Sequence, residues 1–248
     1  MSDFLSNTNN HILNDKYHIL SGSALKVIAV ITMLIDHTGS VFLSGNPIPL
    51  FTVAGHTLTL YTVLRFIGRI SFPIFAYLIV EGFLHTSDRK NYGLRLFIFA
   101  LISEIPWNLE HSGTIWYSGQ NVFFTLLLGY LGLCVLERIE KEKLSVNYLL
   151  MLLLLMVISV VLRSDYGISG FGFIVMLFIL RNNQLYQTVL GACILSSRWK
   201  ASLAFIPIWL YNGKRGFINT RAKTIAFYLI YPVHMLLFYY IKLKTIGY

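Results

Sequence analysis

The run from residue 25 to residue 42 constrains the fold most, because an apolar stretch long enough to cross a bilayer holds Asp36 and His37 deep inside it. An ionisable group at the centre of a membrane helix costs at least about 2.5–3.5 kcal/mol, so such residues usually face a bundle interior or a water-filled cavity. The sequence therefore predicts an all-α membrane bundle whose other helices shelter this pair.

The composition agrees with a membrane protein. Hydrophobic residues make up 56% of the chain and charged residues only 12%, against about 25% charged residues in a soluble domain. The net charge of +9 comes from short clusters of Lys and Arg between apolar segments, so these clusters are read as topology signals and no nucleic-acid partner is expected. Cys134 and Cys193 lie in apolar segments without metal-ligand spacing, so no metal site is predicted.

Nine apolar segments are candidates for membrane spans of about 17–25 residues. The polar residues 1–23 are expected to form a cytoplasmic N-terminal segment that no cleavage site removes, and residues 24–248 to form one membrane domain. The two shortest segments are marginal as spans. The nine segments are 25–42, 60–84, 92–109, 121–136, 146–162, 167–180, 185–195, 201–211 and 225–241.

The distribution of Lys and Arg predicts the orientation. Most of them fall on the side of the membrane that holds the N-terminus, and the loops 42–60 and 107–124 on the other side contain neither. Since cytoplasmic loops carry the excess of Lys and Arg, we expect the N-terminus in the cytoplasm.

Depth along each segment predicts a common polar layer. With a rise of about 1.5 Å per residue, five segments bring polar side chains to a similar level in the half of the membrane away from the N-terminus. Formal charges in this layer cancel, which limits the desolvation cost of a buried cluster. The residues are Asp36, His37, Arg65, Arg69, Ser103, Glu104, Asn121, Thr125 and His234.

Several of these residues also have a purely structural interpretation. Arg65 could pack a bundle by binding carbonyl groups, and His234, close to Tyr231, could be a satisfied core histidine. Glu81 could lie in the membrane interface. Cations near the cytoplasmic face are most often topology determinants, and the alternative is that they hold the phosphates of a soluble cofactor; they are Arg89, Lys90 and Lys214.

The chemistry of the layer fits acyl transfer. His37 can take and return a proton near neutral pH, and Asp36 or Glu104 could orient it. A nearby arginine such as Arg69 can stabilise an oxyanion. The same residues would also suit a proton relay in a transporter, so the residues alone leave both functions open.

Ordered motifs give a more specific indication, because together they resemble the TraX family of pilin acetylation proteins. A distant similarity to the acyltransferase-3 membrane enzymes rests on Leu25-Lys26 followed by His37. The motifs are Asp36-His37-x-Gly39, Arg65-x-x-Gly68-Arg69-Ile70-Ser71-Phe72-Pro73, Ser103-Glu104-x-Pro106, Asn121-Val122-Phe123-Phe124-Thr125 and Tyr231-Pro232-x-His234.

The resemblance implies a multi-pass acetyltransferase of the bacterial inner membrane that uses acetyl-CoA. In the expected mechanism His37 takes the acceptor's proton, Glu104 or Asp36 orients it, and Arg69, with Asn121, stabilises the oxyanion. Expected partners are acetyl-CoA, membrane lipids and an acceptor peptide or glycolipid; a homo-oligomer is left open. The alternatives are a proton-coupled transporter and a membrane chaperone for a partner helix.

Overall fold

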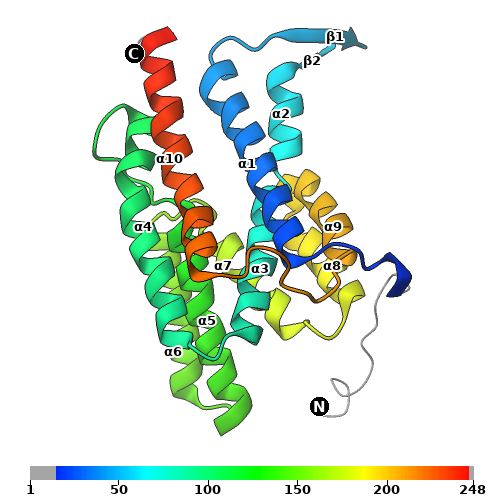
Figure 1. Cartoon of the computed structure of the whole chain (residues 1–248), viewed down its shortest axis with the longest axis vertical. Coiled ribbons are helices and arrows are strands. Elements are labelled where there is room, and N and C mark those ends of the chain that lie inside the picture. The colour runs from blue at the N-terminus through cyan, green and yellow to red at the C-terminus, as the bar shows by residue number, and fades with distance from the viewer. Residues whose placement is uncertain (1–14, 246–248) are drawn as a thin grey trace.

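The computed structural model describes residues 15–245 and is a helical bundle (Figure 1). The predicted cytoplasmic segment 1–23 lies mostly outside the described residues. A short 3-10 turn at Asp15–Tyr17 precedes the bundle. The helices are α1 (Gly22–Leu43), α2 (Leu60–Gly68), α3 (Ser71–His85), α4 (Arg89–Ser112), α5 (Val122–Glu142), α6 (Val146–Val161), α7 (Gly167–Ile179), α8 (Gln184–Ile194), α9 (Phe205–Trp209) and α10 (Arg221–Thr245).

The described residues include four helical segments that are long and apolar enough to cross a membrane. They are Gly22–Leu43, Leu60–His85, Val122–Glu142 and Arg221–Thr245. The helical membrane bundle is thus confirmed, whereas nine spans and the orientation stay predictions. The marginal segment 201–211 forms the end of a 3-10 stretch (Ser196–Ala204) followed by the five-residue helix α9, which is far too short to cross about 30 Å of hydrocarbon.

The second predicted span is interrupted rather than continuous. α2 ends at Gly68 and α3 begins at Ser71, with Arg69 as the C-cap of the first helix. Pro73 occupies the first turn of α3, where a missing backbone N–H costs little. By contrast, Pro106 and Pro232 lie inside α4 and α10, which continue past them. The interruption leaves Arg69 at a helix end in the middle of the span.

The loop between α1 and α2 contains a hairpin that the sequence analysis missed. Strands β1 (Pro49–Val53) and β2 (His56–Thr59) pair antiparallel. The two-residue turn between them has positive φ at Ala54 (50°) and Gly55 (80°), as a type I′ turn requires. The hairpin lies at the same end of the bundle as the C-terminal end of α10 (Figure 1).

Helix packing divides the bundle into two sides. α1 contacts α2, α3 and α10, and α10 also packs on α4, while α5 contacts α4, α6 and α7. α6 buries only Ser159 among its residues, so its apolar surface faces outward, as a lipid-facing helix would.

Backbone hydrogen bonds join the first helix to the segment before the last one. The Gly22 amide donates to the carbonyl of Lys214 (2.8 Å) and the Ser23 amide to that of Arg215 (2.9 Å). The Ser23 hydroxyl donates to the same Arg215 carbonyl and accepts from the Ile218 amide. These bonds fix the start of α1 beside the segment that leads into α10.

Candidate functional site

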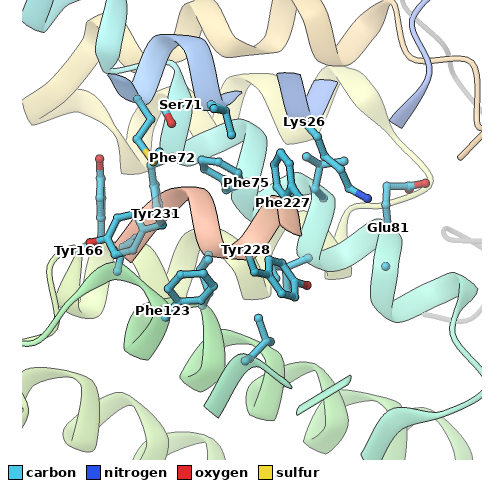
Figure 2. A pocket seen from close by; sticks show the side chains of 18 of the residues that line it. Lys26, Ser71, Phe72, Phe75, Glu81, Phe123, Tyr166, Phe227, Tyr228 and Tyr231 are labelled. Carbon is cyan, nitrogen blue, oxygen red and sulfur yellow. The ribbon is translucent and has the colours of Figure 1, made fainter. Parts of the chain in front are cut away.

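A cavity of about 570 Å³ runs along α1 and is also lined by residues of α2, α3, α4, α5 and α10 and of the segment before α7. Its lining extends from Gly22 and Lys26 at the start of α1 to Ser40 near its end, a distance of about 27 Å at 1.5 Å per residue. Figure 2 shows Lys26 and Glu81 on one side of the cavity and Tyr166 and Tyr231 on the other. The cavity is therefore a long channel between two chemically different ends.

One end, which we call the histidine end, is lined by Asp36, His37, Arg65, Arg69 and His111. Asp36 forms an ion pair with Arg65, with 2.5 Å between Oδ2 and the guanidinium nitrogen and side-chain exposures of 15% and 22%. A Cβ atom on Gly68 would lie 2.1 Å from the Cβ of Asp36. The absence of a side chain at Gly68 thus allows α2 to approach α1 closely enough for the pair to form.

His37 lies against the last helix. Its ring meets that of His234 edge to face, with 5.0 Å between the ring centroids. Nδ1 of His234 is 2.9 Å from the carbonyl oxygen of Ile230, which fixes the ring of His234 on α10. His234 therefore packs against the ring of His37 without lining the cavity.

Aromatic side chains form the walls between the two ends. Phe75, Phe227 and Tyr228 lie across the middle of the cavity in Figure 2. Tyr166 stacks on Phe72, with 3.6 Å between the ring centroids. A channel with these walls suits an extended ligand that is partly apolar.

The opposite end, which we call the basic end, is lined by Lys26, Arg95 and Arg215. Glu81 lines the same region and interacts with the hydroxyl groups of Tyr77 and Tyr211. Burial raises the pKa of Tyr211, so its hydroxyl stays neutral and able to donate a hydrogen bond. Three cations from three segments make this end suitable for a multiply charged anion.

The whole cavity lies within a segment that matches a known family. Residues 21–242 match the family model described as "TraX protein". The chain belongs to the TraX family. It is also 29% identical over 246 residues to a Dichelobacter nodosus protein named "Probable fimbrial assembly protein FimC, serogroup H1", covering 88% of this chain and 93% of that protein. No solved structure matches the chain.

Family membership confirms the resemblance that the ordered motifs indicated. The TraX match begins before α1 and ends within α10, so it includes every helix that lines the cavity. The match and the apolar helices together identify a membrane protein.

The structure does not bring Glu104 to this TraX cavity. Instead its Oε2 accepts a hydrogen bond of 2.6 Å from Nδ2 of Asn121, which also donates to the Ala100 carbonyl. Oδ1 of Asn121 caps α5 by accepting from the Phe123 amide. Both side chains thus hold α4 against α5 and do not line the cavity. Their expected roles, in orienting His37 and in binding an oxyanion, stay predictions.

Two neighbouring candidates also serve the scaffold. The Thr125 hydroxyl accepts a hydrogen bond of 3.3 Å from the Tyr166 amide, which positions the start of α7. Ser103 is fully buried in α4. Neither is among the cavity-lining residues.

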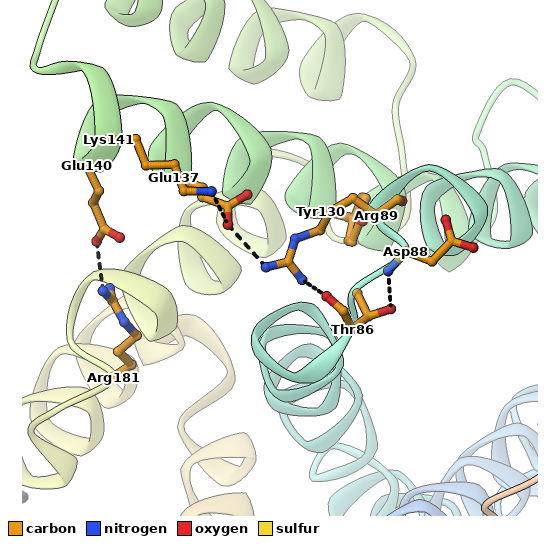
Figure 3. A network of polar contacts seen from close by, with 8 residues as sticks. All are labelled: Thr86, Asp88, Arg89, Tyr130, Glu137, Glu140, Lys141 and Arg181. Carbon is orange, nitrogen blue, oxygen red and sulfur yellow. Dashed lines mark hydrogen bonds and ion pairs between the residues drawn. The ribbon is translucent and has the colours of Figure 1, made fainter.

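The predicted phosphate-binding cations lie outside the cavity as well. Arg89 pairs with Glu137 (3.2 Å) and lies over the ring of Phe83, as part of the network in Figure 3. The side chains of Lys90 and Lys214 are exposed, and neither lines the cavity. The cations that line the basic end of the cavity are instead Lys26, Arg95 and Arg215, none of which was named from the sequence as a phosphate ligand.

The sequence analysis also missed polar residues at the histidine end. His111 and Asp165 line the cavity there, and Glu110 lies 2.5 Å from His111 between Oε2 and Nδ1. The signal was an adjacent acid and histidine directly after an apolar run, in a stretch that was assigned to a loop. α4 in fact continues to Ser112 and carries both residues into the bundle.

Proposed function

We propose that this TraX protein is an acetyltransferase of the bacterial inner membrane that moves an acetyl group from acetyl-CoA to an acceptor. The observation that supports it is the single cavity with a basic end and a histidine end. A nucleotide thioester carries phosphates at one end of a long flexible arm and its reactive carbonyl at the other. Along the cavity, the basic end could receive the phosphates and the histidine end the reactive carbonyl.

The basic end would receive the phosphates of the donor. Lys26, Arg95 and Arg215 supply positive charge from α1, α4 and the segment before α10. With the start of α1 in the cytoplasm, as the loop charges predict, this end opens toward the compartment that contains acetyl-CoA. The pantetheine arm would then lie along the aromatic walls toward His37.

At the histidine end the acceptor's amine or hydroxyl attacks the thioester carbonyl. The new C–N or C–O bond forms while the C=O pair moves onto oxygen, where Arg69 stabilises the negative charge. His37 takes the proton of the attacking group. When the C–S bond breaks, the thiolate leaves and accepts that proton from His37, giving free CoA and the acetylated acceptor.

The acceptor class comes from the relatives and the position of the site. The Dichelobacter protein is named for fimbrial assembly, so we propose a pilin-like peptide, and a membrane glycolipid as the other class. The histidine end lies at the far end of α1 from the basic end. An acceptor would therefore enter from the outer side or laterally from the lipid, opposite the donor.

The test is acetyl transfer by the purified protein in lipid nanodiscs. Release of the CoA thiol from acetyl-CoA is measured with a peptide carrying a free α-amino group and with hydroxyl acceptors. We expect acceptor-dependent release, and a loss of at least about 100-fold in His37→Gln, the typical range for a proton-transfer group.

One control and one alternative make this test decisive. His56→Gln changes an exposed histidine in β2 and should behave as the wild type. If the wild type releases no thiol but moves protons in proteoliposomes under a pH gradient, the cavity serves a transporter and the proposal is rejected.

A further inference from the structure

His111 and Glu110 form an acid–histidine pair that the mechanism above does not use. The ring of His111 lines the cavity, and Glu110 is only 7% exposed. Oε2 of Glu110 lies 2.5 Å from Nδ1 of His111, and Nδ1 is also 3.0 Å from the Trp107 carbonyl oxygen. Trp107 packs on the ring, with 3.5 Å between the centroids. The imidazole is thus held on three sides.

These contacts determine which nitrogen can act as a base. The hydrogen-bond partner of Nδ1 is the Trp107 carbonyl oxygen, an acceptor, so Nδ1 carries the proton and Nε2 keeps the lone pair. An imidazole that takes a proton becomes a cation, which a neighbouring carboxylate stabilises and neighbouring guanidinium groups oppose. His111 adjoins Glu110, whereas His37 shares its surroundings with Arg65 and Arg69.

Acyl transfer to an amine requires a second proton acceptor besides His37. A primary amine near neutral pH is mostly R–NH3⁺, because an α-amino group has a pKa of about 7.7–8.0. It must lose one proton before it can attack and a second after the C–N bond has formed. The thiolate takes up only one of them. One proton must therefore leave the site in each turnover.

We propose that His111, positioned by Glu110, is the second proton acceptor of the cavity. Nε2 of His111 takes the first proton from R–NH3⁺, and the neutral amine then attacks the thioester carbonyl. His37 takes the second proton and returns it to the departing thiolate. His111 releases its proton to water, so the products are the acetylated amine, CoA as the free thiol and one H⁺. This inference rests on the proposed function and assigns a separate step within it.

Other charged and titratable groups lie around His111. The ring of Tyr117 lies 5.7 Å from that of His111 between centroids. Charged and titratable residues from each neighbouring element share the same end of the cavity. They are Asp36 and His37 from α1, Arg65 and Arg69 from α2 and its cap, Asp165 before α7, and Tyr231 and His234 from α10.

The experiment is a pH profile of acetyl transfer to the α-amino peptide. At pH 6.5 we expect His111→Gln to lose roughly 15–30-fold in kcat, because only about 3–6% of an amine with a pKa of about 7.7–8.0 is then neutral. The loss should shrink to about twofold or less at pH 9, where the amine is almost fully neutral. Glu110→Gln should show a smaller loss with the same relief at high pH.

The controls separate this inference from the proposed function. His56→Gln should follow the wild-type profile, and size-exclusion chromatography in detergent checks that each variant is folded. A loss in His111→Gln that is equal at pH 6.5 and pH 9 would mean a structural role and overturn the inference, as would full activity at both. Those outcomes leave the acetyltransferase intact. If His111→Gln does not fold, Glu110→Gln decides by the same profile; a wild type without transfer rejects both proposals.

Discussion

The two ends of the cavity are built differently. At the histidine end charges of both signs meet: Asp36 binds Arg65, Glu110 adjoins His111, and Arg69 and Asp165 line the same end. At the basic end three cations, Lys26, Arg95 and Arg215, outnumber the one acidic residue, Glu81, among the residues that line it. Paired charges hold a fixed geometry, whereas an excess of one sign attracts a mobile anion. Under the proposed function, the histidine end would carry the chemistry and the basic end would bind the donor.

The largest expected effect is on the stability of the histidine end. Removing one partner of a buried ion pair leaves an uncompensated charge and costs about 3–5 kcal/mol. Asp36→Ala should therefore destabilise the protein by roughly this amount in an SDS titration of mixed micelles. Arg138→Ala breaks an exposed pair with Glu142, whose side chains are 66% and 47% exposed, and should cost at most about 1 kcal/mol.

The double variant Asp36→Ala/Arg65→Ala sharpens the result. Because both charges are then gone, it should cost less than the sum of the two single variants. Additive losses would show that the two side chains are not coupled and that the histidine end is not held by this pair.

The next effect concerns the close approach of α2 to α1 at Gly68, which allows Asp36 and Arg65 to pair. A Cβ on Gly68 would lie 2.1 Å from the Cβ of Asp36, whereas a Cβ on Gly172 in α7 would meet nothing within 4 Å. We expect Gly68→Ala to destabilise the fold by about 1–3 kcal/mol through overpacking. Gly172→Ala, also in a helix, is the matched control and should be neutral or slightly stabilising. Equal stability of both variants in the same titration would contradict the packing of α2 on α1.

The basic end should respond in binding rather than in stability. Arg95→Ala and Arg215→Ala should each raise KM for acetyl-CoA about tenfold, or about 1.4 kcal/mol, with kcat nearly unchanged. The matched controls are Lys90→Ala and Lys214→Ala, which remove exposed cations from outside the cavity. If the controls raise KM as much as the cavity variants, the attraction is a property of the whole surface and the basic end is not a phosphate site.

The gathering of Asp36, His37, Arg65 and Arg69 was predictable from the sequence, because depth along a membrane helix follows from counting residues. The position of Glu104 was not, since depth leaves the rotation of α4 about its axis undetermined; that rotation turns Glu104 toward Asn121. The same limit applies to Arg89, which faces Glu137 on α5, while Arg95 six residues later lines the cavity.

The interruption between α2 and α3 and the β1–β2 hairpin were harder to predict from the sequence. Segment 60–84 was predicted as one span, but α2 ends at Gly68 and α3, with Pro73 in its first turn, begins at Ser71 after a break at Arg69. Thr52, Val53, Thr57 and the turn glycine Gly55 do favour a hairpin. The strands β1 and β2 are only five and four residues long, so the segment lengths that predict membrane spans do not reveal them.

The smallest expected effect is the response of the two ends to salt. At 1 M ionic strength the Debye length is about 3 Å, against about 10 Å at 0.1 M. Solvent reaching the basic end should screen its unpaired cations, so KM for acetyl-CoA should rise a few-fold over this range. The ion pair of Asp36 and Arg65 is mostly buried and screened much less, so kcat should stay nearly constant. A fall in kcat with unchanged KM would reverse the assignment of the two ends, because the salt-sensitive step would then be the chemistry at His37.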